Sequence, residues 1–173
     1  RFCNVRRSDD RVTRWIVENI SEPFSDHLAL WFMLCVARIY NLPATLDDLI
    51  KAPDAWPNRR NFSPQAMGAA IDDRIRRGQQ VFNGAYMIRG QNDQRYQKWS
   101  KGRYVAEVVL GNLWEYREKF KPLPATLEQT HSLIMKFPGW GPFLAFQSIV
   151  DMAFTGLLSG ASDRHSWAAA GPG

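Results

Sequence analysis

The stretch Leu133-Ile134-Met135-Lys136-Phe137-Pro138-Gly139-Trp140-Gly141-Pro142-Phe143-Leu144-Ala145 joins two apolar runs through a Pro-Gly-x-Gly turn. Thr126 and Gln129 have the spacing of a helix-capping box, which predicts that the first run is a helix. Pro142 fits the first turn of a second helix, because the missing proline N–H would have no partner there. The sequence therefore predicts a helical hairpin, over about residues 126–157, that organises an all-α fold.

The turn of this hairpin suits a phosphate group. Glycine reaches left-handed backbone angles and lets another backbone approach closely, and the amides that start the second helix would point outward. The pattern resembles the helix-hairpin-helix element of DNA-binding proteins and base-excision glycosylases, whose hairpin grips the DNA backbone. The resemblance marks Gly139, Trp140 and Gly141 as DNA-binding residues. The alternative is a tight turn that binds nothing, since Pro-Gly-x-Gly recurs widely.

Composition narrows the class of protein. A chain of 173 residues, 45% of them hydrophobic, predicts one domain or two helical lobes that share a core. The net charge of +5 favours a polyanionic partner. No apolar run is long enough to span a bilayer, the N-terminus has no signal-peptide pattern, and two cysteines make no disulfide framework. We therefore expect an intracellular, cytoplasmic protein that does not engage a membrane.

The chain stops at Gly173 without a closing element, which predicts a single helical domain over residues 1–173 that is a fragment of a longer protein. The residues that some chemistries need are missing. His27, His131 and His165 are scattered, and two cysteines are too few for an iron–sulfur cluster, so no metal or other cofactor is expected. The chain has no Gly-x-x-x-x-Gly-Lys loop, so it is not itself a kinase of that class.

Capping and periodicity divide the chain before the hairpin into helices. They are predicted to begin near residues 10, 25, 45, 63 and 98 and to end near residues 20, 40, 51, 77 and 120. Asn41 is a suitable left-handed stop for the second helix. Only 81–88 has strand character. Arg38 stands near the end of the most apolar helix, so its charge requires either a partner or access to solvent.

Polar residues recur on the helix after the hairpin. Phe143, Gln147 and Asp151 lie at four-residue spacing and share one stripe, which either faces solvent or lines a polar pocket. Asp163 follows Gly141 by 22 residues. The resemblance to helix-hairpin-helix glycosylases places Asp163 at the position of their catalytic aspartate. It also argues against a lyase mechanism, because the lysine that forms a Schiff base in some of these enzymes has no counterpart here.

A narrower resemblance covers nearly the whole chain. Short motifs occur in the order Asn4-Val5-Arg6-Arg7 with Asp10-Arg11-Val12-Thr13, Arg38-Ile39-Tyr40-Asn41, Phe82-Asn83-Gly84-Ala85-Tyr86, Phe143-Leu144-Ala145-Phe146-Gln147 with Asp151, and Ala170-Gly171-Pro172-Gly173. Together they resemble the DNA base hypermodification family. That family includes the helical domain associated with hydroxymethyluracil DNA kinases and the α-glutamyl/putrescinyl-thymine pyrophosphorylases, also described as amino acid:DNA transferases.

The resemblance implies a fold like that of helix-hairpin-helix glycosylases, with two helical lobes and a cleft between them. It implies a reaction on double-stranded DNA that carries 5-hydroxymethyluracil, already activated as a phosphate or pyrophosphate ester. An amine, from an amino acid or a polyamine, displaces that leaving group at the methylene carbon. The implied partners are the modified DNA, the small amine donor and a hydroxymethyluracil DNA kinase, in a bacterium or a phage-infected host.

The reaction gives each candidate residue a role. The target nucleotide must be flipped out of the duplex, the departing phosphate needs cations, and the amine must lose a proton. The expected roles are phosphate binding by Arg6, Arg7 or Arg38, proton transfer by Asp163 or Asp151, reading of the uracil edge by Gln147 or Asn41, and stacking by Tyr86. We predict that six of the candidates converge on one cleft: Arg7, Asp10, Arg38, Gln147, Asp151 and Asp163.

Two other functions fit the same sequence. One is a DNA N-glycosylase with Asp163 as its catalytic carboxylate, which would leave abasic sites instead of a heavier base. The other is a DNA-binding module without catalysis that serves a fused or separate kinase.

Overall fold

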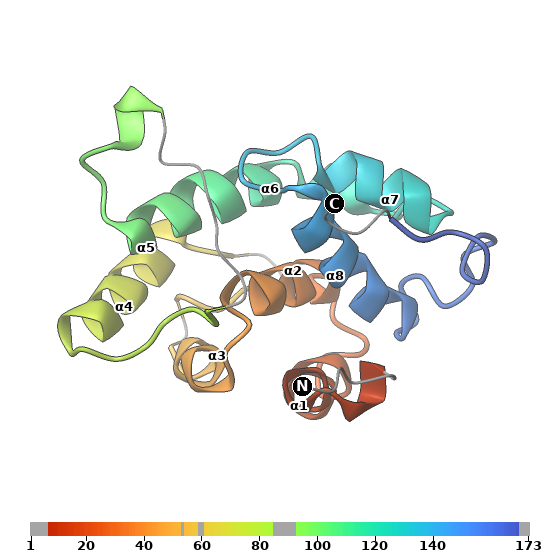
Figure 1. Cartoon of the computed structure of the whole chain (residues 1–173), viewed down its shortest axis with the longest axis horizontal. Coiled ribbons are helices and arrows are strands. Elements are labelled where there is room, and N and C mark those ends of the chain that lie inside the picture. The colour runs from red at the N-terminus through yellow and green to blue at the C-terminus, as the bar shows by residue number, and fades with distance from the viewer. Residues whose placement is uncertain (1–6, 53, 59–60, 85–92, 170–173) are drawn as a thin grey trace.

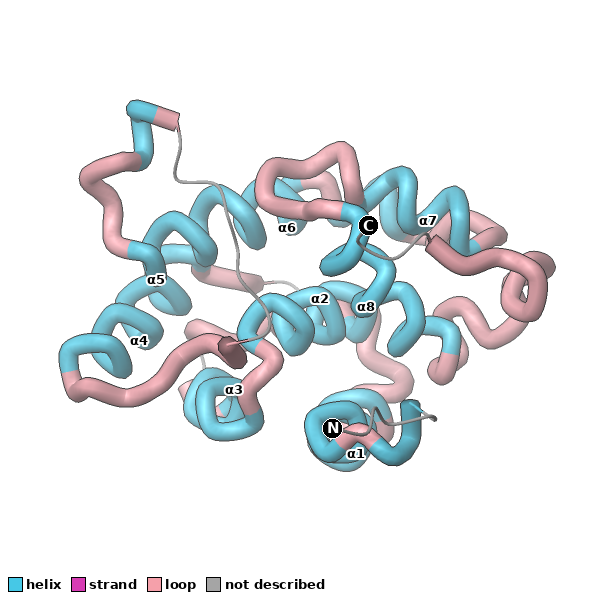
Figure 2. Tube along the Cα trace, viewed as in Figure 1, coloured by secondary structure: helices cyan, strands magenta, loops and turns pink. Residues whose placement is uncertain are grey.

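The computed structural model describes residues 7–52, 54–58, 61–84 and 93–169. Within these ranges all regular secondary structure is helical, which confirms the all-α prediction (Figures 1 and 2). Val81–Gly84 was predicted to have strand character and is irregular; the N–H of Asn83 donates to the carbonyl of Tyr40, 3.1 Å away. The rest of that stretch, from residue 85, lies outside the described residues.

Helix α2, Leu30–Tyr40, forms the centre of the core, and all eleven of its residues are buried. A helix that is apolar on every side has to be surrounded by other elements, and α8 packs against it in the middle of the molecule (Figure 1). Asn41 ends α2 with a φ of 48°, as predicted, and its N–H donates to the carbonyl of Ala37. The helix starts later than predicted, because residues 22–26 and 28–29 form turns.

The N-terminal helix α1, Arg11–Ile16, begins at Asp10, whose Oδ1 accepts the N–H of Thr13 at 2.7 Å. A π-helical turn, η2 (Val17–Ser21), continues it to the predicted end. A 3-10 turn, η1 (Arg7–Asp9), precedes it. This N-terminal segment reaches across to α8 through the side chains described below.

Two helices follow α2. Helix α3, Pro43–Ile50, starts two residues earlier than expected, because Pro43 occupies the first helical turn, where proline is tolerated. Helix α4, Pro64–Arg76, begins at Ser63, whose Oγ accepts the N–H of Ala66, and ends just before Gly78 at a φ of 69°. Both helices match the predicted positions within two residues.

The helix predicted over 98–120 is a succession of helical pieces. It comprises α5 (Lys101–Arg103), the π-helical η4 (Tyr104–Leu110), α6 (Gly111–Glu115) and the 3-10 turn η5 (Arg117–Phe120). Ser100 caps its start by accepting the N–H of Arg103. Because periodicity alone does not distinguish α from π geometry, the sequence could not locate these changes.

The predicted hairpin is present as two helices joined by a glycine turn. Helix α7, Leu127–Ile134, starts at Thr126, whose Oγ1 accepts the N–H of Gln129 at 3.1 Å. Helix α8, Pro142–Ala153, has Pro142 in its first turn and Gly141 as its N-cap. Gly139 carries the left-handed turn at a φ of 81°. Among the described residues, no helix has both the length and the apolar character needed to cross a membrane.

Candidate functional site

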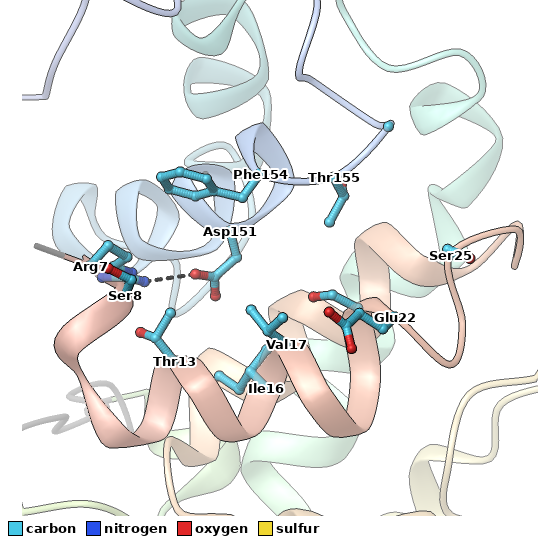
Figure 3. A pocket seen from close by; sticks show the side chains of 12 residues that line it. Arg7, Ser8, Thr13, Ile16, Val17, Glu22, Ser25, Asp151, Phe154 and Thr155 are labelled. Atoms are coloured by element: carbon cyan, nitrogen blue, oxygen red, sulfur yellow. Dashed lines mark hydrogen bonds and ion pairs between the residues drawn. The ribbon is translucent and has the colours of Figure 1, made fainter.

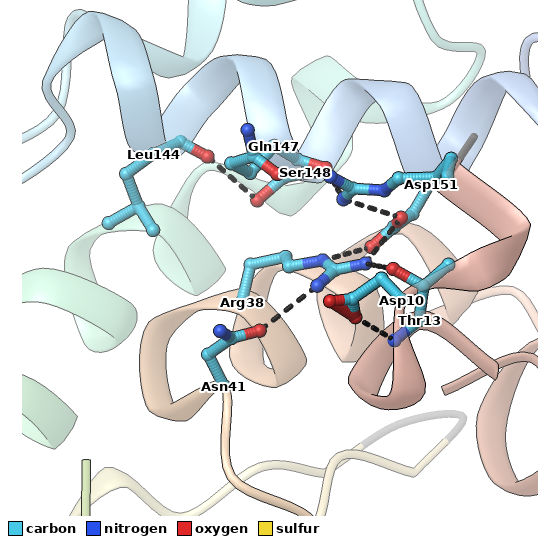
Figure 4. Close-up of polar contacts among 9 residues, drawn as sticks. Asp10, Thr13, Arg38, Asn41, Leu144, Gln147, Ser148 and Asp151 are labelled. Atoms are coloured by element: carbon cyan, nitrogen blue, oxygen red, sulfur yellow. Dashed lines mark hydrogen bonds and ion pairs between the residues drawn. The ribbon is translucent and has the colours of Figure 1, made fainter. Parts of the chain in front are cut away.

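The core of the site is a buried ion pair between α2 and α8. Arg38 is 1% exposed and Asp151 is 5% exposed. The guanidinium donates Nε–H to Asp151 Oδ2 at 2.5 Å and Nη2–H to Oδ1 at 2.8 Å, a two-pronged geometry (Figure 4). Such a pair fixes direction as well as charge, because the planar fork of arginine matches the carboxylate. The ion pair therefore locks the register of α8 against α2.

The other donors of Arg38 bind the neighbouring elements. Nη1 donates to Asn41 Oδ1 at 2.9 Å, and Nη2 donates to Thr13 Oγ1 at 2.9 Å. Asn41 is 4% exposed, and its amide oxygen holds the guanidinium of Arg38 inside the protein. Thr13 belongs to α1, and its contact ties the N-terminal segment to the core (Figure 4).

A second guanidinium, from Arg7, reaches the same carboxylate. Its Nη2 donates to Asp151 Oδ1 at 2.9 Å and to the carbonyl of Gln147 at 3.3 Å, while Nη1 donates to Gln147 Oε1. The side chain of Arg7 is 23% exposed, whereas that of Arg38 is 2% exposed. Two arginines therefore share one carboxylate, which leaves this cluster with a positive charge at its accessible end.

A pocket of about 430 Å³ opens beside Arg7, between the N-terminal segment and the end of α8. Arg7 lies on one side of the pocket and Glu22 towards the other, with Asp151 and Val17 between them (Figure 3). Phe154, which is 63% exposed, also contributes to the wall. The lining comprises Arg7, Ser8, Thr13, Ile16, Val17, Ser21, Glu22, Ser25, Asp151, Phe154, Thr155 and Gly156. One pocket thus offers a cation, a carboxylate and an exposed aromatic ring.

The comparison with protein families decides what this domain is related to. The family model described as "5-hmdU DNA kinase, helical domain" matches residues 1–173. The chain belongs to this family. No curated protein and no solved structure matches the chain. Membership links this helical domain to the modification of hydroxymethyluracil in DNA, and it matches the family resemblance carried by the sequence motifs.

Several predicted site residues of the helical domain meet in the structure. Arg7, Arg38, Gln147 and Asp151 are joined by direct hydrogen bonds, and Asn41 binds Arg38. Asp10 caps α1 beside Thr13, so it holds the helix that supplies this contact (Figure 4). Arg6 and Tyr86 lie outside the described residues. The role of each residue in a reaction stays a prediction.

Asp163 is bound at another place. Its Oδ1 accepts the N–H of Leu127 at 2.8 Å, and its Oδ2 accepts the N–H of Glu128 at 3.0 Å. Both oxygens therefore serve the start of α7, and Asp163 is not among the residues that line the Arg7 pocket. Desolvation raises the pKa of this carboxyl, but the hydrogen bonds from Glu128 and Leu127 outweigh it and lower the pKa below its usual value. Asp163 acts as a helix cap in this geometry.

The three predicted DNA-binding residues occupy different environments. Trp140 is 3% exposed, and its indole N–H donates to the carbonyl of Val109 at 3.1 Å, so its side chain anchors the turn from inside. A Cβ on Gly139 would lie 2.6 Å from a methyl of Val109, so this glycine is needed for packing. A Cβ on Gly141 would meet nothing within 4 Å. Of the three, Gly141 is the residue with open space beside it.

Glu22 and Phe154 are among the cavity-lining residues that the sequence did not predict. Neither stands in a motif, and only the folded chain places both on the wall of one pocket. Thr13 did carry a signal, since it closes the Asp10-Arg11-Val12-Thr13 motif. Below the site, burial raises the pKa of the Cys35 thiol far above its ordinary value, against an opposing hydrogen bond with Ser148. This thiol is therefore a packed core group and no nucleophile.

Proposed function

We propose that this domain is a DNA base hypermodification transferase. Its substrate is 5-hydroxymethyluracil in DNA whose hydroxyl has been converted to a phosphate or pyrophosphate ester. The nitrogen of an amine, from an amino acid or a polyamine, bonds to the methylene carbon as the carbon–oxygen bond to the leaving group breaks. The nitrogen loses one proton, and phosphate or pyrophosphate departs with the bonding electrons.

The observation that carries the proposal is the position of Arg7. Its guanidinium is held by Asp151 and Gln147 and remains partly exposed on the wall of the pocket. A fixed guanidinium is well suited to the oxygens of a departing phosphate, because its charge and geometry need no rearrangement during the reaction. Arg38 is too deeply buried to touch a substrate, so in this proposal it positions Asp151 and, through it, Arg7.

The proton acceptor in this proposal is Glu22. Asp151 accepts hydrogen bonds from two arginines, and Asp163 accepts two from the backbone of α7, so both carboxylates already have structural partners. Glu22 lines the pocket away from Arg7 and is exposed to solvent. An ammonium group bound there would lie opposite the phosphate, which is the order that a displacement requires. Phe154 offers a face on which a flipped base can stack.

The deciding experiment is mass spectrometry of nucleosides. Duplex DNA with unmodified, phosphorylated or pyrophosphorylated 5-hydroxymethyluracil is incubated with the protein and a panel of amines and amino acids. A heavier nucleoside that depends on both the activated ester and the amine supports the transferase. Arg7→Ala should lower single-turnover conversion by about 10²-fold or more, as the loss of one fixed charge-stabilising donor does. Arg14→Ala, also an exposed arginine of this segment, is the matched control and should retain conversion.

The proton-transfer role has its own variant. Glu22→Gln keeps the size of the side chain and removes the carboxylate, and it should slow conversion by about 10²–10⁴-fold while DNA affinity is unchanged. Conversion at the wild-type rate by Glu22→Gln would remove this residue from the mechanism. Conversion at the wild-type rate by Arg7→Ala would contradict the proposal itself.

A second function, a DNA-binding module without catalysis, is favoured by the description of the family as a domain of a DNA kinase. In that case the pocket would hold the modified nucleotide for a kinase, and the same assay would show binding of the DNA without any new nucleoside. The N-glycosylase alternative has less support, because Asp163 is engaged at the start of α7. Abasic sites in the treated DNA would restore it.

A further inference from the structure

A groove of about 300 Å³ borders the turn of the hairpin. It shares no lining residue with the Arg7 pocket. It lies between the short helical turn η3 (Gln94–Tyr96), the segment η4 and the turn itself. Its lining comprises Asp93, Arg95, Tyr96, Tyr104, Val108, Asn112, Pro138 and Gly139. The turn that is proposed to hold a DNA phosphate therefore forms one wall of a second recess.

Tyr96, which lines the groove, is surrounded by aromatic rings and cations, of which Tyr104 and Arg95 also belong to the lining. The ring of Tyr96 lies 5.0 Å from that of Trp99 and 5.6 Å from that of Tyr104. The guanidinium of Arg95 lies over Tyr96 at 5.3 Å, and that of Arg103 lies over Trp99 at 3.7 Å. These contacts gather two further aromatic rings and two guanidinium groups around Tyr96. Stacking rings beside cations are the two elements with which proteins bind a single nucleic-acid strand.

The positive charge of residues 93–104 also favours a nucleic-acid strand as the ligand. Residues 93–104 contain four basic side chains and one acidic side chain, Asp93. Arg95 pairs with Asp93 but is 75% exposed, so its guanidinium can also reach a phosphate. An exposed ion pair is weak, so exchanging a carboxylate for a phosphate costs little.

We propose that this groove binds one DNA strand as unpaired nucleotides, with a base stacked at Tyr96 and a backbone phosphate near Arg95. The proposal rests on the proposed function, in which the protein acts on DNA. It adds a site for the strand that becomes unpaired when a nucleotide leaves the duplex. A recess of this size admits a base but no duplex, and only an unpaired base can expose its face to a tyrosine.

The test compares two single strands of equal length and charge. One is oligodeoxythymidylate, and the other carries abasic tetrahydrofuran residues in place of the nucleosides. The wild-type chain should bind the first about tenfold more tightly, because only that strand can stack. Tyr96→Leu keeps an apolar side chain in the cluster but removes the ring, so its affinity for oligodeoxythymidylate should fall to its affinity for the abasic strand. Circular dichroism and thermal unfolding verify that the variant is folded.

The contribution of the charge is tested by a matched pair of variants. Arg95→Ala should weaken binding to both strands and reduce the slope of log affinity against log salt concentration by about one. Arg76→Ala on α4 is the control, since Arg76 is 73% exposed and also pairs with an aspartate, and it should leave the slope unchanged. Arg95→Ala leaves the aromatic cluster intact, so it tests the groove even if Tyr96→Leu does not fold.

Equal affinity of the wild type for the two strands would overturn the proposal, as would a preference that persists in folded Tyr96→Leu or an unchanged salt slope in Arg95→Ala. Failure of the proposed function gives a different result. In that case the duplex is not bound or not modified, while the preference for bases over abasic residues can persist. If duplex DNA is modified but the wild type binds both single strands equally, the groove does not bind an unpaired strand, and the proposed function still holds.

Discussion

The side chain of Asp151 neutralises Arg38 inside the core and at the same time fixes Arg7 at the pocket. These two tasks have different energetic consequences. An arginine that is buried must keep a counter-charge, because a desolvated and unpaired cation is strongly unfavourable. Arg7 is partly exposed, so water still solvates it and its pairing with Asp151 matters less for stability. A single carboxylate therefore links the stability of the fold to the geometry of the site.

We predict that Asp151→Asn lowers the free energy of unfolding by about 3 kcal/mol, since it leaves Arg38 buried without a counter-charge. The measurement is the urea midpoint at an unchanged slope. Asp47→Asn is the control, because Asp47 forms an exposed ion pair with Lys51 and its loss should leave the urea midpoint nearly unchanged. Similar losses for both variants would mean that burial does not determine how much the Arg38–Asp151 pair contributes to the free energy of unfolding.

Asp163 gives a pH-dependent prediction. Its pKa is lowered in the folded protein below the ordinary 3.8, so the charged form stabilises the fold. This contribution is fully present above the unfolded pKa and is lost as the pH falls through the folded value. Asp163→Ala should cost about 1 kcal/mol at pH 7, as the loss of a helix cap does. The gap between wild type and variant should narrow below about pH 4. A gap that is constant down to about pH 3 would contradict the capping role.

At the scale of elements, the two glycines of the hairpin turn are expected to behave differently. Gly139→Ala places a methyl group 2.6 Å from Val109 at a positive φ, so it should lower the free energy of unfolding by about 1–3 kcal/mol. Gly141→Ala should change it by less than about 0.5 kcal/mol, because its φ of −80° suits any residue and its surroundings are open. Denaturant unfolding of both variants measures this. Equal losses would mean that the contact with Val109 does not constrain the turn.

The difference between Gly139 and Gly141 also decides which variant can test DNA binding by the hairpin turn. A bulky residue at Gly139 disturbs the fold, so a loss of affinity there would not identify a DNA contact. Gly141→Glu preserves the packing and places a negative charge at the start of α8, so it should weaken binding to duplex DNA of any sequence.

The ends of the helices were the best-predicted features. Asp10, Ser63 and Thr126 cap helices through their side chains, and Asn41 and Gly78 have left-handed backbones, as their residue types indicate. These signals are local, so they can be found in a sequence without a structure. The π-helical geometry of η4 and the start of α2 at Leu30 depend on tertiary packing, so the local sequence does not predict them.

The site was predicted only where its residues lie in motifs. Arg38 was singled out because a charge on an apolar helix needs a partner, and Asp151 was singled out by its stripe on α8; the structure pairs them. The prediction for Asp163 rests on its spacing from the hairpin, and spacing does not fix the direction of a side chain. Glu22 shares the lining of the pocket with residues more than 120 positions further along the chain, which a single sequence cannot reveal.

At the scale of the whole molecule, α8 sets the distance between the hairpin turn and the pocket. Pro142 follows the turn and Asp151 lies nine residues further on, so about 14 Å separate them along the helix axis. Successive nucleotides of one strand advance about 3.4 Å along a DNA duplex, so this length corresponds to about four nucleotides. The turn and the pocket should therefore contact different nucleotides of the same DNA.

This spacing predicts where the hairpin binds relative to the modified base. Duplexes with one 5-hydroxymethyluracil and one uncharged methylphosphonate, moved along the strand, are compared for affinity. The largest loss should occur about three to five nucleotides from the modified base, because the turn loses its anionic partner there. Gly141→Glu, which already weakens that contact, should show a flat profile. If the largest loss falls at the modified nucleotide itself, the hairpin turn and the Arg7 pocket do not act together on one bound DNA in the way that the length of α8 requires.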